Sequence, residues 1–163
     1  MFENIHKSPV SFAHTQPNGH GGLVRQLVVV HIFCHAANPV AAHSAPGAVR
    51  IPELGLKIRC EFTKNFAKNR PGTFTFACRC DMIGATNGLV VRPRLPGDAI
   101  RLPGGTKTLK KWFIDRKVPA ARRGLVPVFA DDSGVLAVYG LGQNLDCRAA
   151  EGEPAILFDI EKE

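Results

Sequence analysis

The chain has 163 residues, 45% of them apolar and 21% charged, which is typical of a soluble globular protein with one ordinary domain and some residues to spare. Its five cysteines lack the spacing of a disulfide framework, so we interpret them as reduced thiols of a cytoplasmic protein. The apolar run at 27–37 is broken by two histidines and is too short to span a membrane. We therefore expect neither a membrane segment nor a targeting signal.

The net charge of +7 is concentrated in the middle of the chain. Residues 87–123 carry ten Lys and Arg against two acidic residues, a balance of +8. Residues 124–163 carry two basic and eight acidic residues, a balance of −6. Such a concentrated positive field favours a polyanionic partner.

Residues 1–50 differ from the rest of the chain in composition and pattern. They hold all six histidines and mix Pro, Gly, Ala, Ser and Asn without period. We predict that this block is a poorly patterned leader, either disordered or produced by a mis-assigned gene start. The alternative is a metal site, because His31, Cys34 and His35 would share one face of a helix. Residues 51–71 are interpreted as a linker and residues 72–163 as the folded domain.

The strand patterns begin at residue 72. Phe74, Phe76, Cys78 and Cys80 alternate with polar and small residues, which predicts a half-buried strand at 73–81. Short strands are predicted at 89–92, where Pro93 ends the run, and at 99–102.

A helix is predicted next, capped by Thr106 or Thr108. Leu109, Trp112 and Phe113 then give one apolar stripe, which is more typical of core residues than of stacking platforms. Pro119 opens a single helical turn, and Gly124 ends it.

The remaining residues predict a hairpin at 126–142 and a last strand at 154–161. This order of elements predicts an α+β fold, with a small mixed, largely antiparallel sheet and one or two short helices on one face.

Residues 91–105 combine three arginines with three prolines and three glycines. Proline fixes φ, and a stiff loop loses little entropy on binding. We assign Asp98 to accept backbone N–H groups or to brace an arginine. The residues predicted to shape the loop are Pro93, Pro96, Gly97, Asp98, Gly104 and Gly105.

Arginine suits phosphate because its planar fork donates two parallel hydrogen bonds. The lysines at 107–111 are expected to project from the helix, whose first turn would offer backbone N–H groups to an anion. Because ten cations lie within 37 residues, we predict contact with a phosphate backbone. The candidates are Arg92, Arg94, Arg101, Lys107, Lys110, Lys111, Arg122 and Arg123.

No pattern for catalysis is found. The phosphate-loop pattern GxxxxGK[ST] and the nucleophile pattern GxSxG do not occur, and no histidine follows His43. Asp131 and Asp132 fall in a turn, where acids usually bind their own backbone. We assign no catalytic residue, metal ligand or cofactor to this chain.

Residues 72–163 resemble the C-terminal domain of the bacterial tRNA(Ile)-lysidine synthetases. The family pattern runs VRPRxPGD, KKLFIDxKVP, RxxxPVxxD and VxGLG, and its four parts occur here in order. They match Val91 to Asp98, Lys110 to Pro119, Arg123 to Asp131 or Asp132, and Val138 to Gly142. Leu95 stands where the family often has a further basic residue.

The resemblance implies that full-length members join lysine to the wobble cytidine of tRNA(Ile), using ATP and Mg²⁺. The chemistry would lie in an N-terminal domain with an SGGxDS loop, and the C-terminal domain would grip the tRNA towards its acceptor stem. The RNA-contacting role is carried over to Arg92, Arg94, Arg101, Lys107, Lys110 and Lys111.

The chain contains no SGGxDS loop. We therefore expect a truncated gene product or a free-standing module that binds tRNA but does not catalyse the ligation. Two alternatives stay open: a protein-interaction module that docks a separately encoded catalytic domain or another acidic partner, and a metal-dependent enzyme built on the N-terminal histidines. No membrane partner is expected.

Overall fold

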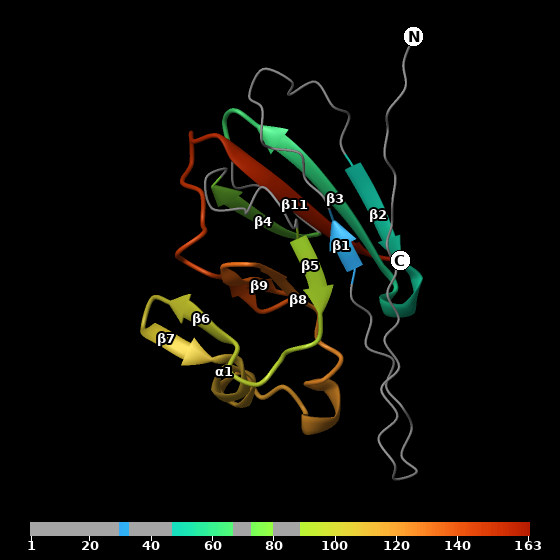
Figure 1. The fold of residues 1–163 in the computed structure, drawn as a ribbon, viewed down its shortest axis with the longest axis vertical. Coiled ribbons are helices and arrows are strands. Elements are labelled where there is room, and N and C mark those ends of the chain that lie inside the picture. The colour runs from blue at the N-terminus through green and yellow to red at the C-terminus, as the bar shows by residue number, and fades with distance from the viewer. Residues whose placement is uncertain (1–29, 33–46, 67–72, 80–88) are drawn as a thin grey trace.

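The computed structural model describes residues 30–32, 47–66, 73–79 and 89–163. This part of the chain forms two antiparallel sheets and a separate hairpin (Figure 1). The first sheet has the order β2 (Gly47–Ile51), β3 (Leu56–Thr63), β11 (Ala155–Lys162), β4 (Phe74–Arg79). The second has the order β1 (Val30–Ile32), β5 (Leu89–Arg92), β8 (Val128–Asp131), β9 (Gly134–Val138), β10 (Gly142–Gln143).

The hairpin consists of β6 (Ala99–Leu102) and β7 (Gly105–Thr108). It leads into one α-helix, α1 (Leu109–Asp115). Two single 3₁₀ turns, η1 (Pro52–Leu54) and η2 (Ala120–Arg122), complete the described elements. The predicted α+β class with largely antiparallel pairing is confirmed. Among the described helices, none is long and apolar enough to cross a membrane.

Strand β11 lies at the centre of the four-stranded sheet. It pairs with β3 on one side and with β4 on the other, and Ala155 through Ile160 are all buried. Ile156, Phe158 and Ile160 pack into the main core, while Ala155 and Leu157 join a smaller cluster on the opposite face. Both faces of this strand are therefore covered, which is why its sequence reads as a nearly continuous apolar run.

Aromatic rings join the two sheets. The ring of Phe76 on β4 stacks on that of Phe158 with centroids 4.8 Å apart, and it lies 5.2 Å from that of Phe129 on β8. Phe74 packs edge-on against Tyr139 at 5.5 Å. These contacts place the main core between the sheets.

The linker predicted at 51–71 is not what the structure contains. Residues 56–63 form β3, which pairs with β11 along its whole length. Leu56 and Ile58 are buried, whereas Arg59 is exposed and Lys57 is partly so. The segment LKIRCEFT alternates apolar residues with charged or polar ones, which is the pattern of a half-buried strand, and the linker prediction overlooked it.

The predicted leader also contributes to the sheets. Residues 30–32 form β1, which pairs with β5, and residues 47–51 form β2, which pairs with β3. His31 therefore lies on a strand and not on the helix that the metal hypothesis requires. Cys34 and His35, and the rest of residues 1–46, lie outside the described residues.

The strand predicted at 73–81 is described from Phe74 to Arg79, and Cys80 and Asp81 lie outside the described part. The predicted half-burial fails at Ala77, which is as buried as Phe76 and Cys78, while Arg79 on the same face is exposed. Leu157 and Ala149 cover the face on which Ala77 lies.

A second core lies below the sheets, where α1 packs on the five-stranded sheet. Trp112 and Phe113 pack there with Val128, Val135 and Val138, as the apolar stripe predicts. The Thr108 hydroxyl accepts a hydrogen bond from the Lys111 amide, so Thr108 is the N-cap. Thr106 and Lys107 belong to β7 instead, so the helix is shorter than predicted.

Candidate nucleic-acid interface

The loop that follows β5 is held by a network centred on Asp98. The Arg92 guanidinium donates two hydrogen bonds to the Asp98 carboxylate, at 2.7 and 2.9 Å. The Leu95 amide donates to the same carboxylate at 2.7 Å, and the Leu109 amide donates to the Asp98 carbonyl at 2.8 Å. Gly97 has a φ of 88°, the left-handed conformation that glycine adopts without strain. The network fixes the loop against the start of α1.

Arg92 is consequently a poor phosphate donor in this structure. Only 15% of its side chain and 11% of that of Asp98 are exposed, and the two are paired in a bidentate fork. Its geometry suits a residue that holds the loop in place and leaves phosphate contacts to its neighbours.

The pKa of Asp98 reports the strength of this network. Partial burial opposes ionisation of the carboxyl group. The hydrogen bonds from Arg92 and Leu95, with the charges of Arg92 and Arg94, outweigh that effect and hold the pKa below the usual 3.8. The ionised form is therefore favoured more in the folded protein than in the unfolded chain.

We expect Asp98→Asn to lower the free energy of unfolding at pH 7 by about 1.5–3 kcal/mol, because hydrogen bonds to a charged group are lost. A depressed folded-state pKa contributes stability above the unfolded value, and the contribution is lost as pH falls through the folded value. Urea unfolding of both proteins between pH 7 and pH 3 should show the wild-type advantage shrinking below pH 3.8. An advantage unchanged across this range would contradict the assignment.

Three further predicted cations also have partners. Arg101 forms an ion pair with Asp146 at 3.6 Å, and Lys107 forms one with Asp115 at 2.8 Å. Both pairs are about half exposed and add little stability. The Arg123 guanidinium donates to the Val118 carbonyl at 2.8 Å, which fastens the turn after α1.

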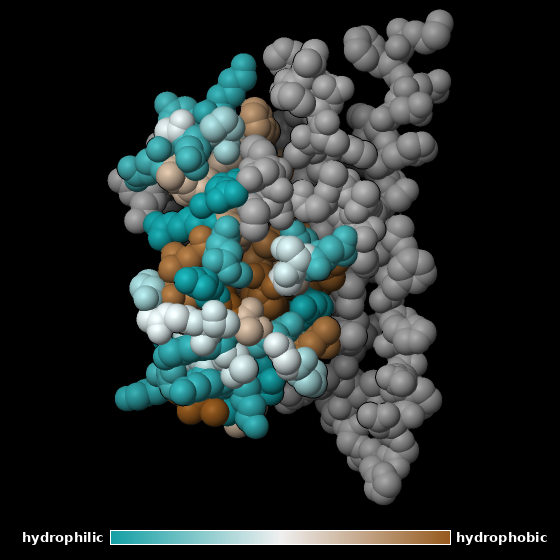
Figure 2. Space-filling model, turned by 60° about the vertical axis from the view of Figure 1, so that its left-hand side comes forward, coloured by the Kyte–Doolittle hydropathy of each residue, from teal (hydrophilic) through white to brown (hydrophobic). Residues whose placement is uncertain are grey.

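Four predicted cations make no ion pair or hydrogen bond through their side chains within the described part of the chain: Arg94, Lys110, Lys111 and Arg122. They come from the loop after β5, from α1 and from η2, which lie together at the lower end of the molecule in Figure 1. Figure 2 shows this end as mainly hydrophilic surface. We call these four residues the basic end.

Two more cations lie next to the basic end and were not among the predicted contacts. Arg116 is exposed, with its guanidinium 6.0 Å from the centre of the Trp112 ring. Lys117 is exposed and has a φ of 55°, a left-handed conformation at a helix end where glycine is the usual residue. The sequence could have indicated these two cations, because Arg116 and Lys117 directly follow the predicted helix and precede Pro119.

Two backbone amides in the first turn of α1 already have hydrogen-bond partners and are not free for an anion. The Leu109 amide donates to Asp98, and the Lys111 amide donates to the Thr108 hydroxyl at 3.4 Å. With only seven residues, α1 also has a weak dipole. The contribution of this helix to binding would come from its lysine side chains.

The acidic turn behaves as the sequence predicted. The Asp131 carboxylate accepts hydrogen bonds from the amide and the hydroxyl of Ser133, at 2.8 and 2.5 Å. Within the described residues, no three His, Cys, Asp or Glu side chains are grouped as metal ligands.

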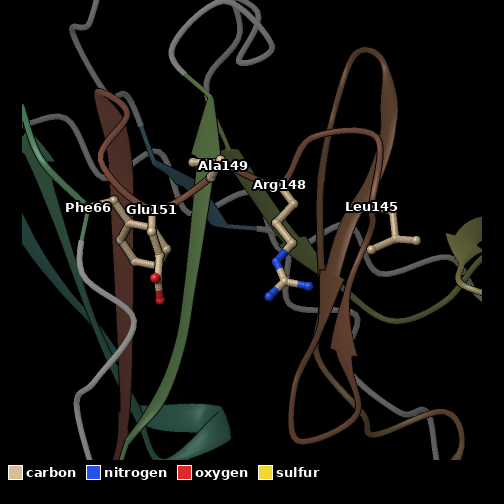
Figure 3. A pocket seen from close by; sticks show the side chains of 6 residues that line it. Phe66, Leu145, Arg148, Ala149 and Glu151 are labelled. Atoms are coloured by element: carbon tan, nitrogen blue, oxygen red, sulfur yellow. The ribbon is translucent and has the colours of Figure 1, made fainter.

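A shallow cavity of about 480 Å³ lies on another side, beside the connection from β10 to β11. Figure 3 shows Phe66 and Glu151 on one side of it, and Arg148 and Leu145 on the other. This lining offers one cation and one acid, and it includes no residue of the basic end.

A solved structure has the same fold. The crystal structure of a TilS C-terminal domain superposes with a TM-score of 0.59 and 28% sequence identity, covering 74% of this chain and 94% of that one. Residues 89–163 make up less than half of the chain, so the similarity includes strands that precede β5. The described residues thus have the fold of a TilS C-terminal domain.

Sequence comparisons agree with the fold. The chain is 51% identical over 53 residues to the tRNA(Ile)-lysidine synthase of Exiguobacterium sibiricum, covering 32% of this chain and 13% of that protein. It is 39% identical over 59 residues to the enzyme of Clostridioides difficile, covering 35% and 13%, and 34% identical over 99 residues to that of Geobacillus kaustophilus, covering 59% and 21%. The family model for the TilS substrate C-terminal domain matches residues 89–160. Residues 89–160 are therefore similar to the substrate C-terminal domain of the tRNA(Ile)-lysidine synthases, and the chain spans about a fifth or less of the length of these relatives.

Proposed function

We propose that this chain binds tRNA for a tRNA(Ile)-lysidine synthase and contacts the RNA backbone through the basic end. The observation that carries the proposal is that four cations without a side-chain hydrogen bond or ion pair among the described residues lie on three neighbouring segments: the loop after β5, α1 and η2. Arg116 and Lys117 lie beside them. A-form RNA is recognised mainly by its shape and its phosphates, which suits fixed Arg and Lys side chains. The domain that these residues belong to supports tRNA as the polyanion.

The lysine ligation belongs in this proposal to a catalytic domain that the described residues do not supply. ATP and Mg²⁺ would be bound there, and we propose no site for either in the described part of the chain. We also propose a cytoplasmic location, because Cys78 and Cys147 are free thiols, as expected in a reducing compartment.

A titration of labelled tRNA with the full chain tests the proposal. With four to six phosphate contacts, we expect log K to fall linearly with log salt concentration at a slope of roughly −3 to −5. Fluorescence anisotropy between 50 and 300 mM salt measures this slope. A DNA duplex of similar length is the control, and it should bind more weakly if the A-form shape contributes.

A flat response to salt, or no measurable affinity for tRNA, would refute the proposal. If the chain instead co-purified with an acidic protein and ignored tRNA, the docking of a separate protein would be its role.

A further inference from the structure

Two cysteines that are 69 residues apart in sequence meet in the main core. The Cys78 Sγ on β4 lies 3.7 Å from the Cys147 Sγ, which belongs to the segment between β10 and β11. Both residues are buried, with 0% and 2% of their surfaces exposed, and both are free thiols. The backbones are held together as well, because the Arg79 amide donates to the Cys147 carbonyl at 2.9 Å.

Polar groups surround the two sulfur atoms, although the site lies in an apolar core. The Gln143 amide Nε2 lies 3.7 Å from each sulfur and donates towards both. It also donates to the Ala77 carbonyl at 2.6 Å, which fixes its orientation. A buried amide directed at two sulfurs stabilises negative charge on them, which apolar packing alone does not require.

The hydrogen bond between the thiols makes them unequal. The Cys78 thiol donates to Cys147, and this bond lowers the pKa of Cys147, with Gln143 acting in the same direction against the effect of burial. The same bond raises the pKa of Cys78, and burial adds to that rise. The negative charge of Asp131 raises the pKa of both thiols and so acts against the effect of Gln143. Cys147 is therefore the better nucleophile and Cys78 the proton donor beside it.

We propose that Cys78 and Cys147 are a reversible oxidation site, at which hydrogen peroxide converts the two thiols into a disulfide. The Cys147 thiolate attacks one peroxide oxygen: the S–O bond forms, the O–O bond breaks, and the hydroxide released takes up a proton to become water. Cys78 then attacks the sulfenic sulfur, so that the S–S bond forms and the S–O bond breaks. The hydroxide that leaves takes the Cys78 proton, and one peroxide has been reduced to two waters.

Burial selects the class of oxidant. With at most 2% of either residue exposed, a bulky disulfide such as oxidised glutathione cannot reach the sulfurs, whereas hydrogen peroxide can enter on local opening. The segment that would open borders the cavity described above, since Leu145 and Arg148, on either side of Cys147, both line it. The same segment also contacts the hairpin of β6 and β7, because the Leu145 amide donates to the Arg101 carbonyl at 3.0 Å.

The test treats the native full chain with hydrogen peroxide, blocks the remaining thiols under denaturing conditions and digests with trypsin. Cleavage after Arg79 separates Cys78, in peptide 69–79, from Cys80. Cys147 lies in peptide 124–148. We expect these two peptides to be joined, and a reductant to release them.

Cys80→Ser is the matched control and should leave the joined peptides unchanged, whereas Cys78→Ser and Cys147→Ser should abolish them. We also expect oxidation to raise the melting temperature of the wild-type protein by about 5–10 °C, because the bond closes a long loop. Recovery of both cysteines as blocked thiols, separate sulfinic acids, or a bond from Cys147 to Cys80 would each overturn the proposal.

Discussion

The combined replacement of Arg94, Lys110 and Lys111 by glutamine should weaken tRNA binding by about 10- to 100-fold near 100 mM salt. These side chains have no described partner, so their removal costs the fold little, and each was available for a phosphate. The slope of log K against log salt should become shallower by about 2–3, because up to three phosphate contacts are lost. Anisotropy titrations at several salt concentrations measure both quantities.

The matched control removes the same charge elsewhere. Arg50, Lys57 and Arg59 lie on β2 and β3, and Arg50 and Arg59 make exposed ion pairs with Glu163 and Glu161. Their replacement by glutamine should change the affinity much less, because long-range effects are screened at this salt concentration. Equal losses from the two triple variants would mean that net charge, and not the basic end, determines binding.

The replacement of Trp112 by alanine should lower the free energy of unfolding by about 3–5 kcal/mol. Only 2% of Trp112 is exposed, and its ring packs in the second core beneath the five-stranded sheet. The ring also lies against Gly142, where an added Cβ would be 3.6 Å from it. Loss of this side chain would leave a cavity between α1 and the sheet that the surrounding residues fill only in part.

Denaturant unfolding of the Trp112→Ala and Trp112→Phe variants measures the effect by circular dichroism. Phenylalanine keeps most of the apolar contact, so we expect a loss of about 1–2 kcal/mol for that variant. Because Trp112 is the protein's sole tryptophan, its emission also reports on the site, and acrylamide should quench it poorly. An alanine variant within 1 kcal/mol of wild type would show that the ring is a surface platform.

Local sequence signals predicted the C-terminal half well. Alternation and turn residues indicated β5, the β8–β9 hairpin and β11, and the spacing of Leu109, Trp112 and Phe113 indicated the buried face of α1. These elements carry their pattern within a few residues. Strands β1 and β2 were not predicted, because strands of three to five residues give too few repeats of the alternating pattern. The rest of residues 1–50 shows no hydrophobic period either.

Which cations form hydrogen bonds or ion pairs within the domain could be predicted only in part. The sequence indicated a stiff basic loop and suggested that Asp98 braces an arginine. Which arginine donates hydrogen bonds to Asp98 depends on the turn made by residues 93–98. This turn makes Arg92 the donor, while Arg94 acts on Asp98 only through its charge. The pairing of Arg101 with Asp146 depends on contacts between distant segments, for which one sequence gives no signal.

The position of β11 has a consequence for where this domain can be cut. The family model begins at residue 89, yet β11 has β3 and β4 as its neighbours, and both precede that residue. A protein trimmed to the matched range would keep residues 155–160 of β11 and leave both edges of this apolar strand without hydrogen-bonding partners. Bare edges of this kind recruit other chains, so such a fragment would form insoluble aggregates, and expression boundaries are better set before Gly47.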